Sequence, residues 1–201
     1  VVKCNPFLDY PLMDLRNSNI WLLSIYPKWH TRLFPDSILK TEDPTSIIAD
    51  VSHTNSIMKV YIGWAKDLVL LKSGDGLIMY LTAESGKSAE YSAVASSLCM
   101  VTEVKSVDSF QDKANFISEL LPYSVFTKEE LSGFFTSPNR KNMFVIKMLY
   151  NIALPKRPIR RALIENGIIT RDARPTFLSI EKSQLDRLLS IGEVYEGIVI
   201  Y

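Results

Sequence analysis

Residues 71–82, LKSGDGLIMYLT, constrain the fold more than any other stretch of this sequence. The run Ser-Gly-Asp-Gly at 73–76 is typical of a turn, and residues 77–81 are apolar on both faces of a strand. Because such a strand cannot face water, it predicts a central strand with other elements around it. Residues 93–104, AVASSLCMVTEV, predict a second strand of this kind, after a polar stretch at 83–91 with hairpin-type turn residues.

The remaining elements are predicted from apolar spacing and capping residues. Core strands are expected at 20–26 and 143–150. Short helices are expected at 28–34, 54–62, 110–121, 127–135, 160–166 and 179–191, with caps at Thr54 or Asn55, at Thr127 with Glu130 three residues later, and at Ser179. Strands and short helices in no regular β-α-β rhythm indicate an α+β fold, a small mixed or antiparallel β-barrel with flanking helices. The four apolar strands are expected in one curved, mostly antiparallel sheet or barrel.

Composition limits the class of protein. The chain has 201 residues, of which 47% are hydrophobic, so it can bury a substantial core. No run approaches the roughly 18–20 apolar residues of a membrane helix, and no signal peptide is recognisable, so we expect a cytoplasmic protein. Residues 1–19 are expected to be an extended strap or a linker from a missing upstream part, followed by one domain at 20–201. Cys99 is expected to be a buried free thiol, and the histidines and cysteines lack metal-ligand spacing, so no metal or cofactor is predicted.

Positive charge is concentrated in one segment. The formal net charge is +1, yet residues 137–174 carry nine basic and two acidic side chains, which makes this segment +7 and the remainder −6. A localised basic patch is expected of a surface that meets phosphate, whereas the alternative is a solvated face whose charges pair with acids elsewhere.

Several motifs in a fixed order resemble one superfamily. In chain order they are LSIYP, KWHTRLFP, HTNSIMKVYI, GDGLIMY, SLCMVTEV, FVIKMLY and PTFLSIEKSQLDRLL. Together they resemble the PUA-like superfamily, in particular its ASCH and EVE branches. They are most similar to the PUA-like domain found behind a GNAT-type acetyltransferase domain in bacterial proteins. The resemblance spans residues 20–191 and implies a small β-barrel that binds RNA or modified bases; some ASCH members are nucleases or amidohydrolases.

Two family patterns are incomplete in this chain. Of the ASCH signature Gly-x-Lys-x-x-Glu-x-Arg, only Lys40 and Glu42 fall in the right region, and the glycine and arginine are absent. The glycine-rich acetyl-CoA loop of GNAT enzymes is absent as well. Acetyl transfer would therefore belong to an upstream domain, which is a possible partner of this one.

The resemblance also suggests site residues. It places His30 and His53 beside the barrel cleft, where they would do acid–base work with Lys40 or Glu42, or else make ordinary hydrogen bonds. Aromatic residues are candidates for base stacking, although Trp21 alternates within a core strand and is expected to be structural; the others are Trp29, Trp64, Tyr61 and Tyr80. The predicted ligand-binding set is Trp29, His30, Asn55, Ser56, Lys59, Tyr80 and Thr82. The predicted phosphate-binding set is Lys156, Arg157, Arg160 and Arg161.

Three functions are compatible with these observations. The first is a module that binds RNA or a modified base. The second is an ASCH-type hydrolase acting on RNA or an acylated nucleoside, with His30 or His53 in the reaction. The third is a protein-interaction domain that regulates an attached acetyltransferase and binds no nucleic acid.

Overall fold

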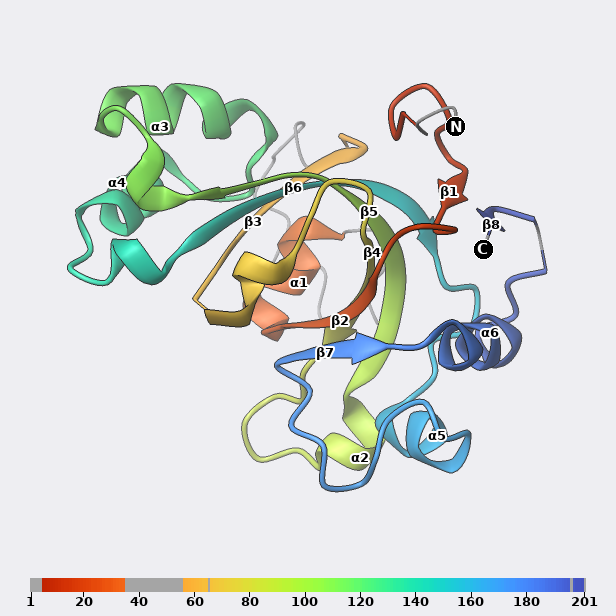
Figure 1. Ribbon diagram of the computed structural model, residues 1–201. Helices are drawn as coiled ribbons and strands as arrows, with labels where there is room; N and C mark the ends of the chain where they lie inside the picture. Colours follow the sequence, from red (N-terminus) through yellow and green to blue (C-terminus); the bar gives the residue numbers. More distant parts are fainter. Residues whose placement is uncertain (1–4, 35–55, 65, 196, 201) are drawn as a thin grey trace.

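The computed structural model describes residues 5–34, 56–64, 66–195 and 197–200, and at its centre is a curved six-stranded sheet (Figure 1). The strands follow the order β3-β6-β5-β4-β2-β7; β2 and β4 run parallel and all other neighbours are antiparallel. Their bounds are β2 (Ile20–Ile25), β3 (Met58–Gly63), β4 (Gly76–Leu81), β5 (Val94–Ser106), β6 (Phe144–Ala153) and β7 (Phe177–Ile180).

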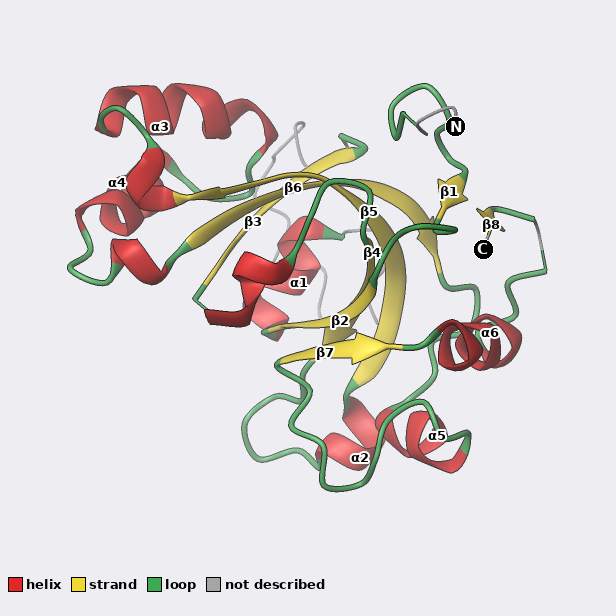
Figure 2. Ribbon diagram, in the orientation of Figure 1, coloured by secondary structure: helices red, strands yellow, loops and turns green. Residues whose placement is uncertain are grey.

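Helices cover both faces of this sheet and one of its ends (Figure 2). They are α1 (Pro27–Leu33), α2 (Ala89–Ser92), α3 (Lys113–Leu120), α4 (Lys128–Thr136), α5 (Arg160–Glu165) and α6 (Lys182–Ile191). A short parallel pair, β1 (Met13–Asp14) with β8 (Val199–Ile200), lies beside the main sheet and brings the two ends of the chain together.

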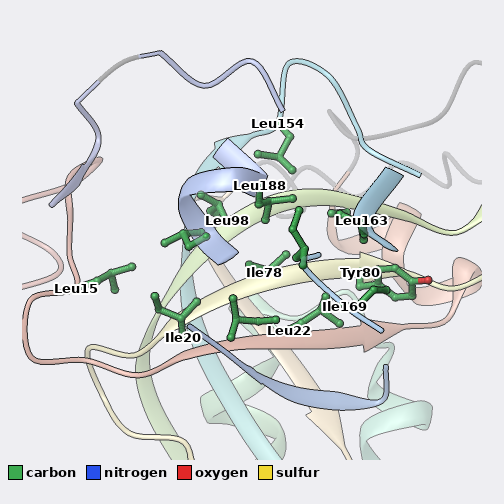
Figure 3. Packing of buried hydrophobic residues seen from close by; sticks show 14 of the residues in the cluster. Leu15, Ile20, Leu22, Ile78, Tyr80, Leu98, Leu154, Leu163, Ile169 and Leu188 are labelled. Carbon is green, nitrogen blue, oxygen red and sulfur yellow. The ribbon is translucent and has the colours of Figure 1, made fainter. Parts of the chain in front are cut away.

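Alternate residues of β4 enter two different hydrophobic clusters. Ile78 and Tyr80 pack toward α5 and α6 (Figure 3), whereas Leu77 and Met79 pack toward α1 and the 3-10 turn Lys66–Leu70. All six residues of β4 are buried, which confirms that this strand is central and apolar on both faces.

A third hydrophobic cluster packs α3 and α4 against β3 and the start of β6. The predicted capping box of α4 is present: the Thr127 hydroxyl accepts from the Glu130 N–H, and the Glu130 carboxylate accepts from the Thr127 N–H. Arg32 of α1 connects to this part of the molecule: it forms an ion pair with Glu130 of α4 at 3.2 Å and donates to the Val125 carbonyl.

The predicted fold class is confirmed, with one correction. The four apolar strands all lie in one curved, mostly antiparallel sheet. The sheet is not closed into a barrel, because its edge strands β3 and β7 do not pair with each other in the described part of the chain. β7 is only four residues long and pairs with β2 alone.

Two helix predictions were wrong. Residues 58–63 form strand β3 and not the middle of a helix; their side chains enter two clusters, Val60 and Ile62 in one and Tyr61 in the other. The last helix begins at Lys182 after the Glu181 cap, because Ser179 belongs to β7 and pairs with Trp21 of β2. The proposed caps Thr54 and Asn55 lie outside the described residues.

The expected buried free thiol is present. Cys99 is a free, fully buried thiol, and burial raises its pKa. In the part of the chain that the structure describes, no helix combines the length and apolar character needed to cross a membrane. The same described residues contain no cluster of histidine, cysteine and acidic side chains suited to a metal ion.

Within the predicted strap, Met13 and Leu15 are buried in the cluster shown in Figure 3.

One buried carboxylate joins the turn before β4 to β2. Asp75 accepts hydrogen bonds from the Asn19 N–H at 3.1 Å, the Trp21 indole N–H at 3.0 Å and the Lys72 N–H at 3.0 Å. Its own carbonyl accepts from the Val101 N–H of β5. The residue is only 3% exposed. Its carboxylate therefore holds the turn before β4 against the start of β2, and its carbonyl holds the same turn against the middle of β5.

Asp75→Ala is therefore expected to lower the free energy of unfolding by about 2–4 kcal/mol, because it leaves two backbone N–H groups and an indole N–H without their acceptor. Urea denaturation measures this change. Asp67→Ala, at an exposed position of the nearby 3-10 turn, is the matched control and is expected to stay within about 0.5 kcal/mol of the parent. Equal effects of the two substitutions would contradict a special role for Asp75.

Candidate functional site

A cleft of about 570 Å³ opens where the sheet fails to close. One wall comes from β3 and the residues after it, the floor from the end of β2, and the other wall from the loop that leads into β7. Its lining consists of Leu23, Ser24, Tyr26, Tyr61, Gly63, Trp64, Leu68, Thr82, Ala173, Arg174, Pro175 and Thr176. The volume is in the range of pockets that hold small organic ligands.

Three aromatic side chains of the described residues line this cleft. Tyr26 directly follows β2 and is 70% exposed, and Trp64 directly follows β3 and is 48% exposed. Trp64 is held edge-on against Phe134 of α4, with ring centroids 5.7 Å apart. Tyr61 is buried, and burial followed by the nearby Tyr26 raises its pKa to about 12. The phenol of Tyr61 therefore stays neutral at physiological pH and can donate a hydrogen bond.

Gly63 leaves room between two of these lining residues. A Cβ atom at this position would lie 2.6 Å from Leu68 Cδ1 and 3.0 Å from Tyr61 Cε1. A larger residue there would push one of these side chains, so glycine allows both to pack in the wall as they do.

The polar lining comes from short side chains and one cation. The Ser24 N–H donates to the Thr176 carbonyl at 3.0 Å, which joins the floor to the loop wall. The Thr82 hydroxyl donates to the Ile25 carbonyl at 3.4 Å. Arg174 is exposed and is the one charged side chain among the described residues that line the cleft. An apolar, aromatic cleft with a guanidinium in its wall suits a flat ring that carries negative charge nearby.

His30 lies in the core and does not line this cleft. The side chain is fully buried, and Nε2 is 2.6 Å from the Ser96 hydroxyl, with donor and acceptor set by the tautomer. Nδ1 is buried and has no hydrogen-bond partner among the described residues. Burial, followed by the positive charge of Arg157, lowers the pKa of His30 to about 3. The imidazole is therefore neutral at physiological pH, and its depth separates it from any ligand in the cleft.

The other predicted ligand-binding residues have varied positions. Thr82 lines the cleft, whereas Tyr80 is buried in the cluster of Figure 3. Trp29 packs against Phe126 at 4.9 Å and lies outside the cleft lining. The Ser56 hydroxyl accepts from the Met58 N–H at the start of β3. Lys59 is buried, with its ammonium 5.8 Å from the ring centroid of Tyr150.

Four predicted residues, His53, Lys40, Glu42 and Asn55, lie outside the described residues. Their roles, and a cleft shared by His30 and His53, stay predictions. Among the stacking candidates, Tyr61 and Trp64 line the cleft, and Trp21 has the structural position expected of it: it stacks on Phe177 of β7 and donates to Asp75.

Much of the basic segment is paired with other groups. Five of its cations form ion pairs with acidic residues: Arg140 with Asp108, Lys147 with Glu103 and Glu119, Lys156 with Glu193, Arg161 with Glu165, and Arg171 with Glu90. Arg160 donates to two backbone carbonyls. Exposed pairs of this kind are weak enough to exchange for phosphate, so the phosphate-binding role of this corner stays a prediction.

Tyr26 and Arg174 line the cleft, although the sequence patterns do not predict them there. Tyr26 lies between the end of β2 and Pro27 at the start of α1. The chain leaves the sheet at this point, so the side chain can reach the edge of the cleft. Arg174 precedes β7, whose last two residues fall in the predicted helix 179–191 and whose first two carry no predicted element, so the sequence does not predict its loop beside β2. Recognising FLSI as a strand would have placed Arg174 at the sheet edge.

Comparison with known proteins relates the fold to solved ASCH structures. ASCH from Zymomonas mobilis aligns with a TM-score of 0.55 and 8% identity over 86% of this chain and 94% of that chain. A point mutant of the same Zymomonas mobilis protein gives 0.53 and 7% over 86% and 97%. A hypothetical protein from Leishmania major gives 0.51 and 11% over 88% and 96%. No protein-family model matches the sequence, and no curated protein matches it.

The similarity supports the fold and carries no residue-level information at such low identity. The chain shares its fold with these ASCH structures, which agrees with the fold that the resemblance implies. The association with an acetyltransferase is not part of this agreement.

The buried imidazole of His30 predicts a pH dependence of stability. The imidazole of His30 takes up a proton near pH 6.5 in the unfolded chain, its ordinary pKa, but only near pH 3 in the folded chain. The contribution of His30 to the free energy of unfolding is therefore fully present above pH 6.5 and is lost as the pH falls toward 3. The expected loss due to His30 is about 2 kcal/mol by pH ~5. Urea denaturation at several pH values measures it.

His30→Gln should remove this part of the pH dependence. His53→Gln is the matched control, because it removes the other histidine and leaves His30 in place. A pH dependence that is unchanged in His30→Gln and lost in His53→Gln would contradict the assignment.

Proposed function

We propose that this protein binds nucleic acid and holds an unpaired or extruded base in the cleft between β3 and the loop before β7. The observation that carries the proposal is the composition of the cleft, with aromatic side chains from the β3 wall and the floor and a single guanidinium among its described lining residues. Every base has an aromatic face, so stacking binds it with little dependence on sequence. The PUA-like fold is consistent with this role.

Tyr26 and Trp64 are the proposed stacking residues. Both are exposed at the ends of strands, and the packing of Trp64 against Phe134 restricts its ring before a ligand arrives. Tyr61, Thr82 and the backbone of the 173–176 loop supply donors and acceptors for the edge of the base. This arrangement favours RNA or DNA with unpaired bases over a regular duplex.

Arg174 is the proposed phosphate contact inside the cleft. It is exposed, it lines the cleft, and no ion pair to an acidic residue occupies it in the described part of the chain. Lys156 and Arg157 lie earlier in the same basic segment and would contact the flanking phosphate backbone. A cytoplasmic location and an upstream acetyltransferase domain stay predictions of the sequence.

The direct test is fluorescence anisotropy with labelled single-stranded RNA, single-stranded DNA and duplex, each with and without modified bases, over a range of salt. We expect binding to the single strands that weakens steeply with added salt, because cations on the protein release counterions from phosphate. Absence of binding to all probes at low salt would contradict the proposal.

Tyr26→Ala and Trp64→Ala should each weaken binding of single strands by roughly 5- to 150-fold, because stacking contributes about 1–3 kcal/mol per base. The salt dependence should stay as in the parent, since neither residue is charged. Tyr195→Ala is the matched control, because Tyr195 is 83% exposed and lies outside the cleft lining. Losses of the same size in all three variants would mean that Tyr26 and Trp64 do not stack on the base.

Arg174→Ala should weaken binding and also flatten the plot of log K against log salt by about 0.7, the value for one phosphate contact of a single strand. Arg140→Ala removes the same charge at a position paired with Asp108 and distant in sequence from the cleft loop. It should leave the slope nearly unchanged. Identical slopes for the parent and Arg174→Ala would remove Arg174 from the phosphate contacts.

A further inference from the structure

We infer that Arg160 is a positioning residue that fixes the loop wall of the cleft, and that this is its main role in place of a phosphate contact. The inference rests on the proposed function for its consequence on binding, but the geometry behind it is independent of any ligand.

The Arg160 side chain holds the loop through two hydrogen bonds. Its Nη2 donates to the Arg171 carbonyl at 3.0 Å and to the Ala173 carbonyl at 2.7 Å. Ala173 and the next three residues line the cleft. Both hydrogen bonds are charge-assisted, so they are stronger than ordinary backbone contacts.

The backbone of Arg160 is itself anchored to the sheet. Its N–H donates to the Ala93 carbonyl at 2.8 Å, just before β5, and the adjoining Ile159 forms a bridge with Val94. The guanidinium lies near the phenol of Tyr80; burial raises the pKa of Tyr80 and Arg160 offsets part of the rise. Tyr80 belongs to the core cluster of Figure 3, so Arg160 links that core to the loop.

In the described part of the chain, the other supports of the loop are the packing of Ala173 against the core cluster, short-range contacts within the loop and contacts at its two ends. Before it, Ile168 and Ile169 are buried in the same core cluster, and after it the Thr176 carbonyl accepts from Ser24 and the chain enters β7. Between these points, the Ala173 N–H donates to the Thr170 carbonyl at 3.3 Å, and Arg171 pairs with Glu90 at 3.3 Å with its side chain 76% exposed. An ion pair this exposed contributes little. Among the described residues, Arg160 is therefore the side chain from outside the loop that hydrogen-bonds its backbone, at Arg171 and Ala173, beside the packing of Ala173 against the core cluster and the Thr170–Asp172 contact within the loop.

A residue in this role shapes the cleft without touching the ligand. When the two carbonyls lose their donor, the loop samples more conformations, and Arg174 and Thr176 no longer present a fixed wall. Binding then weakens because the ligand must order the loop. The number of phosphate contacts stays the same, so the salt dependence should not change.

The first experiment uses the free protein and needs no ligand. Hydrogen exchange followed by mass spectrometry should show exchange in 171–176 at least about tenfold faster in Arg160→Ala than in the parent, with β4 and β5 unchanged. Arg161→Ala is the matched control: it is one residue along α5, removes the same charge, and pairs with Glu165 and Tyr91 outside the loop. Unchanged exchange of the loop in Arg160→Ala would overturn the inference.

The second experiment separates positioning from charge in single-stranded oligonucleotide binding. Arg160→Ala should weaken binding about tenfold with the salt slope of the parent, unlike Arg174→Ala, which should flatten it. Arg160→Lys keeps the charge but replaces the planar guanidinium by a shorter ammonium, and it should still show fast loop exchange and weak binding. A flattened slope in Arg160→Ala, or parent-like behaviour in Arg160→Lys, would overturn the inference in favour of a charge contact. If no oligonucleotide binds the parent, the proposed function fails, while faster loop exchange in Arg160→Ala alone still supports the role of Arg160 in holding the wall.

Discussion

The hydrogen bonds of the Asp75 carboxylate set the geometry on which the cleft depends. They tie the residues before β4 to the first residues of β2, and the two strands then run parallel in register from Ile20 opposite Gly76 to Ile25 opposite Leu81. A slip by one residue would exchange the two faces of β2. Because the register holds to the far end, Ser24, Tyr26 and Thr82 come out together at the cleft floor and rim. A carboxylate at one end of these strands thus helps to place these cleft residues at the other end.

The four central strands of the sheet and most helices were predictable because local patterns agree with their burial. β4 and the first part of β5 are buried on both faces, and their continuous apolar runs show this directly. The capping box at Thr127 and Glu130 marks the start of α4 by a mechanism that involves only four residues. Gly167, with φ of 63°, follows α5 as expected of a helix end. In each case the stabilising contact lies within, or next to, the segment that encodes it.

The cleft was less predictable because its walls come from the segments whose local patterns mislead. Ile57, Val60 and Tyr61 have helical spacing, yet β3 is an edge strand whose alternate residues enter separate clusters. β7 is four residues long and carries little pattern of its own; it is a strand because β2 offers it an open edge and because Phe177 stacks on Trp21 at 4.6 Å. Both are tertiary causes. Tyr61 and Arg174 therefore line the same cleft because of the order of strands in the sheet, and no local sequence pattern predicts that order.

The basic segment shows how charge in a sequence divides between structural and binding roles. Its net charge of +7 suggested a phosphate surface, but most of its cations have nearby acids, and Arg160 points its guanidinium at backbone carbonyls. Arg174 is different, because it lies in the cleft wall and its loop is held by Arg160. The two arginines thus have complementary positions. Arg174 lines the cleft, and Arg160 holds the loop that carries Arg174. A cleft built on an open sheet edge needs such a support, since no barrel strand in the described part of the chain closes that side and fixes the loop.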